Sequence, residues 1–174
     1  AKQGARTLFH VLQPKSDGSC NLHAATASVC GRVCMLFSSV AALIGSAGQA
    51  NYASANVCLD TLAACQRAGG RAGVSVQWGA WAEVGMAARG AARGRMATLH
   101  ASSGIALIGL AQGLAAFCTV VHGRAPAVLG MLPVSWSRML GRAVTPAFLS
   151  SFSPHARAPT SARRMEGTGA PATH

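Results

Sequence analysis

The most informative stretch of this sequence, residues 37–60, carries hydroxyl, phenol and amide side chains at distinctive spacings. Ser38 and Ser39 close a short apolar run, and Tyr52, the chain's one tyrosine, precedes Asn56 by four positions. In a helix this spacing sets the phenol and the amide on one face, one turn apart. A serine at the end of a strand can donate a hydrogen bond to a carbonyl oxygen while a tyrosine delivers a proton to it.

Such a set needs two more components before it could reduce a carbonyl group. Tyrosine has a reference pKa of about 10, so it is a poor proton donor at neutral pH unless a cation lies nearby. Lys15 is the one plausible cation near the correct part of a parallel sheet. No side chain can deliver a hydride, so a nicotinamide would have to supply it. The pattern indicates a carbonyl reductase, although each residue alone could equally be a structural or solvated side chain.

The elements that would position these residues alternate between strands and helices. Short apolar runs predict strands, and longer periodic segments predict helices. The expected strands are residues 33–37, 72–78 and 125–134, and the expected helices between them are residues 52–67 and 106–121. This order predicts an α/β fold with a doubly wound parallel sheet and helices on both faces. Ligands bind such sheets beyond the carboxyl ends of the strands, where Ser39 and Trp81 fall.

The segment before the first strand is expected to be interrupted. Apolar residues at helical spacing predict a helix over residues 5–13 that ends at Pro14. A turn or a helix start at residues 15–18 and a second short helix through residues 21–23 would follow. Residues 1–150 form the expected folded domain. Residues 151–174 carry three prolines and almost no large apolar side chains, which predicts a disordered linker or tail.

The composition limits other classes of function. A formal net charge of +11 would permit a nucleic-acid or anionic-membrane partner, but the arginines are scattered and not interleaved with aromatic residues. A basic binding protein stays a less favoured alternative, and we expect no nucleic-acid partner. The six cysteines form no CxxC pair, which favours a reducing, cytoplasmic compartment and no metal site. Residues 101–121 approach membrane-spanning length, but their serines, glycines and glutamine favour a buried helix.

Several motifs resemble the ketoreductase domains of modular polyketide synthases and animal-type fatty acid synthases, within the short-chain dehydrogenase/reductase superfamily. The motifs are Leu36-Phe37-Ser38-Ser39, Gly45-Ser46-Ala47-Gly48-Gln49-Ala50-Asn51-Tyr52, Asn56, Leu59-Asp60, Pro14-Lys15-Ser16-Asp17-Gly18, Asn21-Leu22-His23, Val76-Gln77-Trp78-Gly79-Ala80-Trp81, Gly104, Gln112-Gly113-Leu114 and Leu132-Pro133-Val134-Ser135-Trp136. The resemblance runs from Pro14 to Leu149. It implies the C-terminal part of such a domain, with a partial Rossmann-type sheet.

The resemblance assigns the family's four catalytic roles to Ser39, Tyr52, Asn56 and Lys15. Ser39 precedes Tyr52 by 13 positions, as in the family. Asn56 occupies the place, four after the tyrosine, where free-standing members of the superfamily carry lysine. Lys15 would orient the nicotinamide ribose beside Tyr52 and lower the pKa of that tyrosine. Asn56 would help to hold a proton-relay water.

The same resemblance implies a cofactor, a substrate and partners. The cofactor is NADPH, and the substrate is a β-ketoacyl thioester on the phosphopantetheine of an acyl carrier protein. Other synthase domains would be further partners. Gln49 and Trp81 would line the substrate cleft, whereas Trp78 would be a core residue and His23 a packed histidine.

The sequence lacks the Gly-rich turn that binds the cofactor's pyrophosphate in this family. We therefore expect the isolated chain to bind NADPH weakly or not at all and to have little activity. We also expect the first strand to have an open, apolar edge. A truncated, non-catalytic synthase remnant stays an alternative. Stereochemistry is not assigned, because Ile44 stands where one stereochemical class carries tryptophan.

Overall fold

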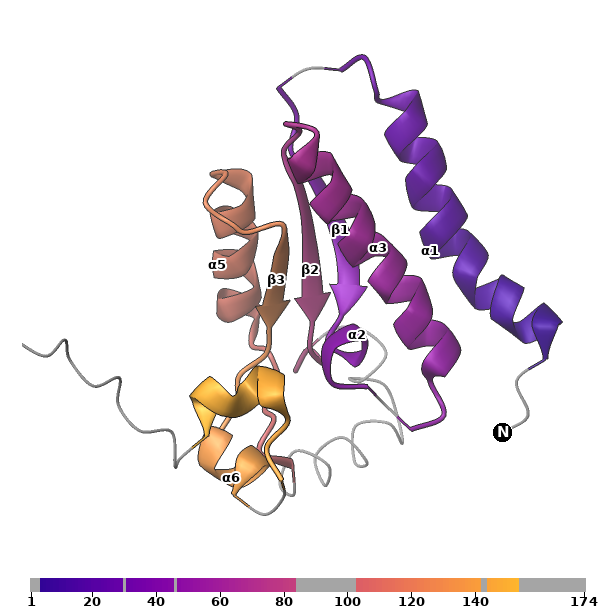
Figure 1. Cartoon of the computed structure of the whole chain (residues 1–174). Coiled ribbons are helices and arrows are strands. Elements are labelled where there is room, and N and C mark those ends of the chain that lie inside the picture. The colour runs from indigo at the N-terminus through magenta and orange to yellow at the C-terminus, as the bar shows by residue number, and fades with distance from the viewer. Residues whose placement is uncertain (1–3, 30, 46, 84–102, 142–143, 154–174) are drawn as a thin grey trace, which may run out of the picture.

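The computed structural model describes residues 4–29, 31–45, 47–83, 103–141 and 144–153. Within these residues, helices and strands alternate along the chain (Figure 1). The elements are α1 (Ala5–Ala25), β1 (Cys34–Ser39), α2 (Ala41–Ile44), α3 (Ala50–Ala68), β2 (Gly73–Trp78), α5 (Leu110–Val121), β3 (Val128–Met131), α6 (Trp136–Leu140) and the 3₁₀ helix η2 (Ala147–Phe152). The tail expected from residue 151 onward lies outside the described residues after Ser153.

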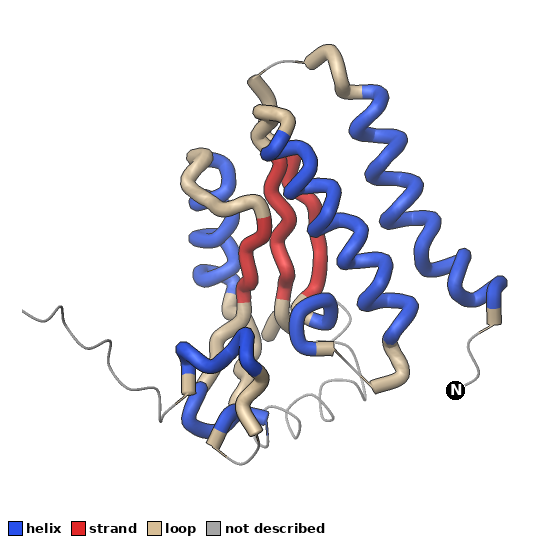
Figure 2. The backbone as a smooth tube through the Cα atoms, viewed as in Figure 1, coloured by secondary structure: helices blue, strands red, loops and turns tan. Residues whose placement is uncertain are grey.

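The three strands form a parallel sheet in the order β1-β2-β3 (Figure 2). Helix α3 connects β1 to β2 across one face, and α5 connects β2 to β3 across the other. The predicted α/β fold with helices on both faces is confirmed. Because the strands shift sideways in the same direction while the helices lie on opposite faces, the two crossovers have opposite hands. One of them is therefore an exception to the right-handed rule for such connections.

Strand β2 separates a polar face from an apolar one, because successive side chains point to opposite sides of a sheet. Its six residues are all buried. Val74, Val76 and Trp78 join Ala116 and Val120 in the larger hydrophobic cluster beneath α5. The alternate residues of β2 are polar and point to the α3 side, where a smaller cluster is built on β1 and α3. The polar residues of β2 are consequently confined to the α3 face.

Helix α1 runs unbroken through Pro14, so the predicted end of a first helix at that residue and the separate second helix are wrong. Proline removes one backbone donor and leaves the carbonyl of His10 without its helical partner. The part of α1 after Pro14 is nevertheless held by contacts to α3. Lys15 bonds to Asn56, and His23 lies 2.9 Å from the amide nitrogen of Gln66. These contacts fix the helical course that the local sequence signal did not predict.

Helix α5 and strand β3 are shorter than their sequence patterns suggested. Helix α5 begins at Leu110 rather than residue 106, and its 12 residues are too few to cross a bilayer. No helix within the described ranges is both long and apolar enough for that purpose. Strand β3 covers 128–131 instead of 125–134, because only these residues continue the ladder with β2. Val134 pairs separately with Ile105.

Strand β1 is fully covered on one face and only partly covered on the other, contrary to the expectation of a strand buried on both. Leu36 and Ser38 are buried beneath α3. On the other face Phe37 keeps 52% of its surface exposed, although its ring lies 5.8 Å from that of Trp78. Within the described residues β1 pairs only with β2, so its other edge is open, as expected.

Candidate active site

Lys15 lies where α1, α3 and β1 meet. Its ammonium donates one hydrogen bond to the backbone oxygen of Phe37 over 2.7 Å and another to Oδ1 of Asn56 over 2.8 Å. The same nitrogen lies 5.7 Å from the centre of the Tyr52 ring, within the range of a cation–π contact. Three of the four residues predicted to form the site, Lys15, Tyr52 and Asn56, are therefore brought together although α1 and α3 are distant in sequence.

Asn56 connects the other two members of this group. Its side chain is fully buried, and its Nδ2 donates to the backbone oxygen of Tyr52 over 2.8 Å, one helical turn earlier. Its Oδ1 must face Lys15, because an ammonium group has donors only. Asn56 thus fixes the ammonium relative to the first turns of α3, which carry Tyr52.

The two serines at the end of β1 have different environments. Ser38 is buried and its hydroxyl donates to the backbone oxygen of Asn56 over 3.3 Å, which is a structural contact between β1 and α3. Ser39 is half-buried, and its oxygen accepts a hydrogen bond from the Ala41 backbone N–H over 3.2 Å. That contact leaves the Ser39 hydroxyl proton for another acceptor. Among the described residues Ser39 makes no hydrogen bond to Tyr52, and its catalytic role stays a prediction.

Burial changes the electrostatics of Lys15. Loss of solvent lowers the pKa of its ammonium group, and the carboxylate of Asp60 opposes this by raising it. The ammonium is thus a partly desolvated charge whose hydrogen-bond partners are uncharged. A developing negative charge on a nearby oxygen would be stabilised more strongly there than in open water.

The two residues predicted to line a substrate cleft lie apart from Lys15. Gln49 is exposed and occupies the N-cap position of α3. Trp81 follows β2, and its ring packs 5.1 Å from the ring of Trp78 and directly over Gly113 of α5. Trp78 is buried, as the sequence predicted. The side chain of Trp81 therefore lies on the α5 side of the sheet, and the cleft roles of Gln49 and Trp81 stay predictions.

Asp60 is a residue that the sequence motif contained but to which no role was given. Its Oδ1 accepts a hydrogen bond from the Ser75 hydroxyl over 2.6 Å, and its Oδ2 accepts one from Nε2 of Gln77 over 2.8 Å. The sequence signal that could have pointed to this role was the pair Ser75 and Gln77, two polar residues at alternate positions of a buried strand. An acceptor on the covering helix is needed to satisfy them.

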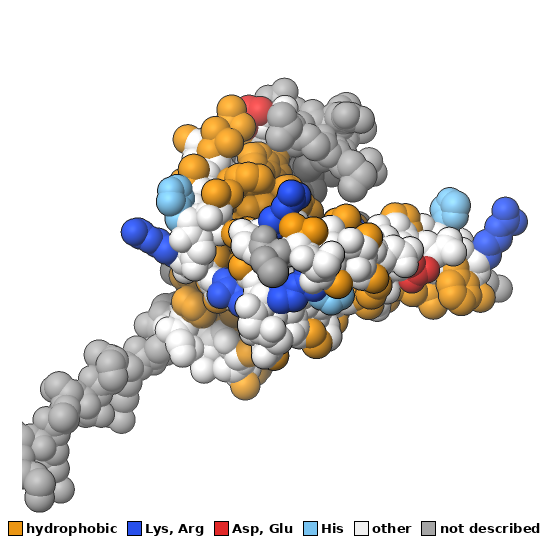
Figure 3. All heavy atoms as spheres, turned by 90° about the horizontal axis from the view of Figure 1, so that it is seen from above, with side chains coloured by type: hydrophobic (Ala, Val, Ile, Leu, Met, Phe, Trp, Pro, Cys, Tyr) orange, Lys and Arg blue, Asp and Glu red, His pale blue; other side chains and the backbone are white. Residues whose placement is uncertain are grey.

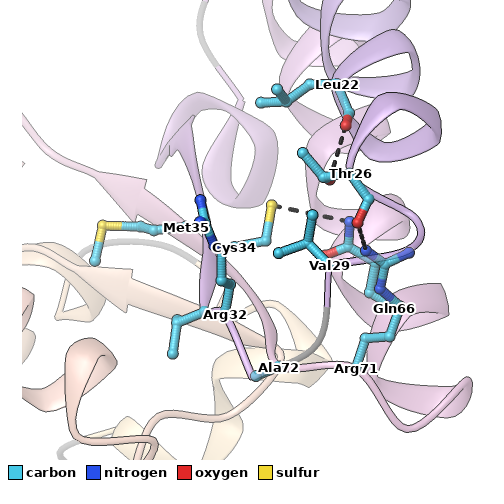
Figure 4. A pocket seen from close by; sticks show the side chains of 10 residues that line it. Leu22, Thr26, Val29, Arg32, Cys34, Met35, Gln66, Arg71 and Ala72 are labelled. Atoms are coloured by element: carbon cyan, nitrogen blue, oxygen red, sulfur yellow. Dashed lines mark hydrogen bonds between the residues drawn. The ribbon is translucent and has the colours of Figure 1, made fainter.

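A cavity of about 230 Å³ lies at the amino ends of β1 and β2, at the end of the sheet opposite to Lys15 (Figure 4). Its lining includes Thr26, Arg32, Cys34, Gln66 and Arg71. Arg71 donates to the backbone oxygen of Thr26 over 3.0 Å. The cavity does not include any residue of the Lys15 group. Within the described ranges, no group of histidine, cysteine and acidic side chains could hold a metal ion.

On the face shown in Figure 3, the basic side chains of the described residues do not gather in one patch. Figure 3 shows one face, on which lysine and arginine side chains are separated by hydrophobic and uncharged ones. This agrees with the scattered arginines of the sequence.

A parallel sheet covered on both faces, with tyrosine and lysine at the carboxyl end of its first strand, defines a Rossmann-type fold of the short-chain dehydrogenase/reductase kind. The KR domain family model matches residues 1–83, which include Lys15, Ser39, Tyr52, Asn56 and Asp60. The chain belongs to the family of ketoreductase domains of polyketide synthases, and it corresponds to one part of such a domain.

The relatives and solved structures agree with this assignment. The chain is 38% identical over 161 residues to the polyketide synthase GfsA of Streptomyces halstedii, covering 91% of this chain and 2% of that synthase. PlmKR1, the ketoreductase from the first module of phoslactomycin biosynthesis in Streptomyces sp. HK803, is 30% identical with a TM-score of 0.76. The alignment covers 90% of this chain and 36% of PlmKR1. A structure of A-type ketoreductases from a modular polyketide synthase matches at 28% identity and a TM-score of 0.71, with coverages of 92% and 30%.

Proposed function

We propose that this chain forms the catalytic part of an NADPH-dependent ketoreductase. The reaction is reduction of a β-ketoacyl thioester to a β-hydroxyacyl thioester in polyketide or fatty acid biosynthesis. The observation that carries the proposal is the position of Lys15, which bonds to Asn56 and lies 5.7 Å from the Tyr52 ring centre. We expect the substrate on the phosphopantetheine of an acyl carrier protein, alongside other synthase domains in the cytoplasm. The multidomain synthases among the relatives support this context.

The residues present fit the nicotinamide-ribose end of the cofactor. An ammonium group has three N–H donors, and Lys15 uses two of them on Phe37 and Asn56. The third is left for a ribose hydroxyl, and the Tyr52 ring centre lies 5.7 Å from the same nitrogen. When bound, NADPH would supply a hydride to the carbonyl carbon. The fit extends to this end of the cofactor only, because the sequence contains no Gly-rich phosphate loop.

The protein side of the reaction is proton delivery to the carbonyl oxygen. As hydride reaches the carbon, negative charge grows on the oxygen, and Tyr52 gives its phenolic proton to it. Ser39 would donate a hydrogen bond to the same oxygen from the end of β1. One hydride and one proton convert the ketone to the alcohol. The remaining phenolate is stabilised by the Lys15 ammonium, whose position Asn56 fixes.

Asn56 and the two cleft residues have supporting roles in this proposal. The oxygen of the Asn56 amide accepts a hydrogen bond from Lys15, and one hydrogen of its Nδ2 is donated to the Tyr52 backbone oxygen. The second hydrogen of Nδ2 is what it could offer to a relay water. Gln49 and Trp81 would contact the acyl chain from the helix cap and from the end of β2.

The alternative is a remnant that keeps the fold without the activity. The chain spans 36% of the length of PlmKR1, so the activity of a whole ketoreductase domain is a proposal for it. The remnant and the enzyme share every residue of the site, so geometry does not separate them, and an assay must.

The test is oxidation of NADPH by the complete gene product that contains this chain, with trans-decalone or a β-ketoacyl thioester as substrate. Tyr52→Phe should lower the rate by about 10²–10⁴-fold, because it removes the proton donor and leaves the ring. Ser54→Ala, an exposed change on the same helix, is the matched control and should leave the rate unchanged. Equal rates for Tyr52→Phe and the parent would remove Tyr52 from the mechanism. No turnover by the parent would favour the remnant.

A further inference from the structure

The carboxylate of Asp60 joins the helix of the proposed site to the central strand. Each of its oxygens accepts one hydrogen bond, from the Ser75 hydroxyl and from the Gln77 amide. Both donors are buried, at 0% and 7% exposure, on the face of β2 beneath α3. Among the described residues only these uncharged groups donate to the carboxylate. A half-buried carboxylate with neutral partners is costly to retain, so its charge calls for an explanation.

Asp60 continues a line of polar residues along α3. Tyr52, Asn56 and Asp60 are spaced four apart, which places them on one face of the helix, one turn from each other. Asn56 stands in the middle, with the Lys15 ammonium on its Oδ1. Asp60 therefore brings the opposite charge to within one helical turn of the group that holds Lys15.

The surroundings of Lys15 offer few other charges. From α3 the Tyr52 ring and the Asn56 amide face it, and from β1 the carbonyl of Phe37 does. On α1 itself, Asp17 lies two positions along the chain and is exposed to solvent. Burial lowers the pKa of Lys15 and the Asp60 carboxylate acts against it. Asp60 is thus the acidic group best placed to keep the ammonium charged.

We propose that Asp60 is a positioning residue for the reductase site: it fixes α3 on β2 through Ser75 and Gln77, and its carboxylate lies one helical turn from Asn56, which holds the Lys15 ammonium. The part of this role that concerns catalysis rests on the proposed reductase function. The contacts and the charge balance are properties of the chain itself, so they can be tested without turnover.

The composition of the chain makes a direct test possible. Lysine occurs only at positions 2 and 15, and aspartate only at positions 17 and 60. A sample of the full chain labelled with ¹³C- and ¹⁵N-lysine gives two side-chain NMR signals, whose pH titrations report the midpoints of Lys2 and Lys15 separately. The measured quantity is the Lys15 midpoint in the parent and in Asp60→Asn, which removes the charge with little change of shape.

We expect Asp60→Asn to lower the Lys15 midpoint, and Asp17→Asn, the matched control, to lower it less. The Lys2 midpoint should be the same in all three proteins. An unchanged Lys15 midpoint in a folded Asp60→Asn chain would overturn the proposal. Because no substrate or cofactor enters the measurement, this result is independent of whether the chain is an active reductase.

A second measurement covers the case in which Asp60→Asn does not fold. In the parent chain labelled with ¹³C-aspartate, the carboxyl signal of Asp60 should shift as Lys15 loses its proton. The Asp17 signal provides the internal comparison and should shift less. A flat Asp60 signal through the Lys15 transition would overturn the electrostatic role.

Discussion

The two faces of the sheet differ in how completely the chain covers them. On the α3 face the polar side chains Ser38, Ser75 and Gln77 all have hydrogen-bond partners within α3. The α5 face is apolar, and α5 covers β2 and β3 but leaves much of β1 exposed, although the Phe117 ring lies 6.4 Å from that of Phe37. The large apolar residues of this face with at least 40% exposure are Phe37, Leu110, Leu114, Phe117 and Val121.

The contacts around Lys15 are complete within this chain, whereas the apolar surface of α5 is left exposed. The Lys15, Asn56 and Tyr52 contacts come entirely from α1, α3 and β1 and require no further polypeptide. The exposed residues of α5 recur at spacings of four, three and four, which is the apolar stripe of a helix that packs against another element. The chain spans 30% and 36% of the two solved ketoreductases, and an exposed apolar face of this kind is typical of a contact surface.

The largest effect should come from breaking the α3 face at its centre. Asn56→Leu removes one of the two hydrogen bonds of the Lys15 ammonium and leaves it only the backbone oxygen of Phe37; it also removes the side-chain hydrogen bond to the Tyr52 backbone oxygen. We expect the free energy of unfolding to fall by about 2–4 kcal/mol, measured by urea denaturation of the chain. Asn21→Leu, on the exposed side of α1, is the control and should stay within about 0.5 kcal/mol of the parent. A similar small loss for Asn56→Leu would mean that the contacts around Lys15 are not structural.

A smaller effect is expected from overfilling the apolar face. A Cβ at Gly113 would lie 2.0 Å from an atom of the Trp81 ring. Gly113→Ala should therefore lower the free energy of unfolding by about 1–3 kcal/mol through overpacking, despite the better helix propensity of alanine.

Gly18→Ala in α1 is the matched change, because its Cβ would meet only the Gln13 backbone oxygen at 3.8 Å. It should raise the stability by up to about 1 kcal/mol. Stabilisation by both changes would show that Trp81 does not lie on α5 as described here.

The sequence predicted the buried apolar strands better than it predicted where a helix ends. Strand β2 falls within one residue of the predicted range, because Val74, Val76 and Trp78 form a continuous buried run. Helix α1 was predicted to end at Pro14, since the local cost of proline is visible in the sequence. The contact of Lys15 with α3, which helps to hold the helix beyond that point, is not visible there.

The site was predicted as a set of residues but not as a set of contacts. The family spacing pointed to Tyr52 and Asn56, and helical periodicity placed them on one face. That Lys15 bonds to Asn56 depends on how α1 packs against α3, which spacing cannot supply. The partners of Asp60 depend on the register between α3 and β2, so Ser75 and Gln77 could not be assigned to it from the sequence alone.

The smallest effect on stability should come from the exposed stripe of α5. Leu114 and Phe117 are 55% and 42% exposed, so replacing both by glutamine removes apolar surface that is mostly in contact with water. We expect the chain to self-associate through this stripe and the double variant to stay monomeric at higher concentration, as measured by analytical ultracentrifugation. Val57→Gln, at a 44% exposed site on α3, should leave association unchanged. Equal association of all three proteins would show that the stripe is not a contact surface.

The central claim is that an ammonium group and a phenol converge at the end of β1. Because the chain has one tyrosine and two lysines, an NMR nuclear Overhauser experiment can test this contact without ambiguity. The structure predicts cross-peaks between the Tyr52 ring protons and the terminal methylene protons of Lys15. A folded chain whose Tyr52 ring shows no contact with Lys15 would contradict the site, and with it the proposed proton delivery.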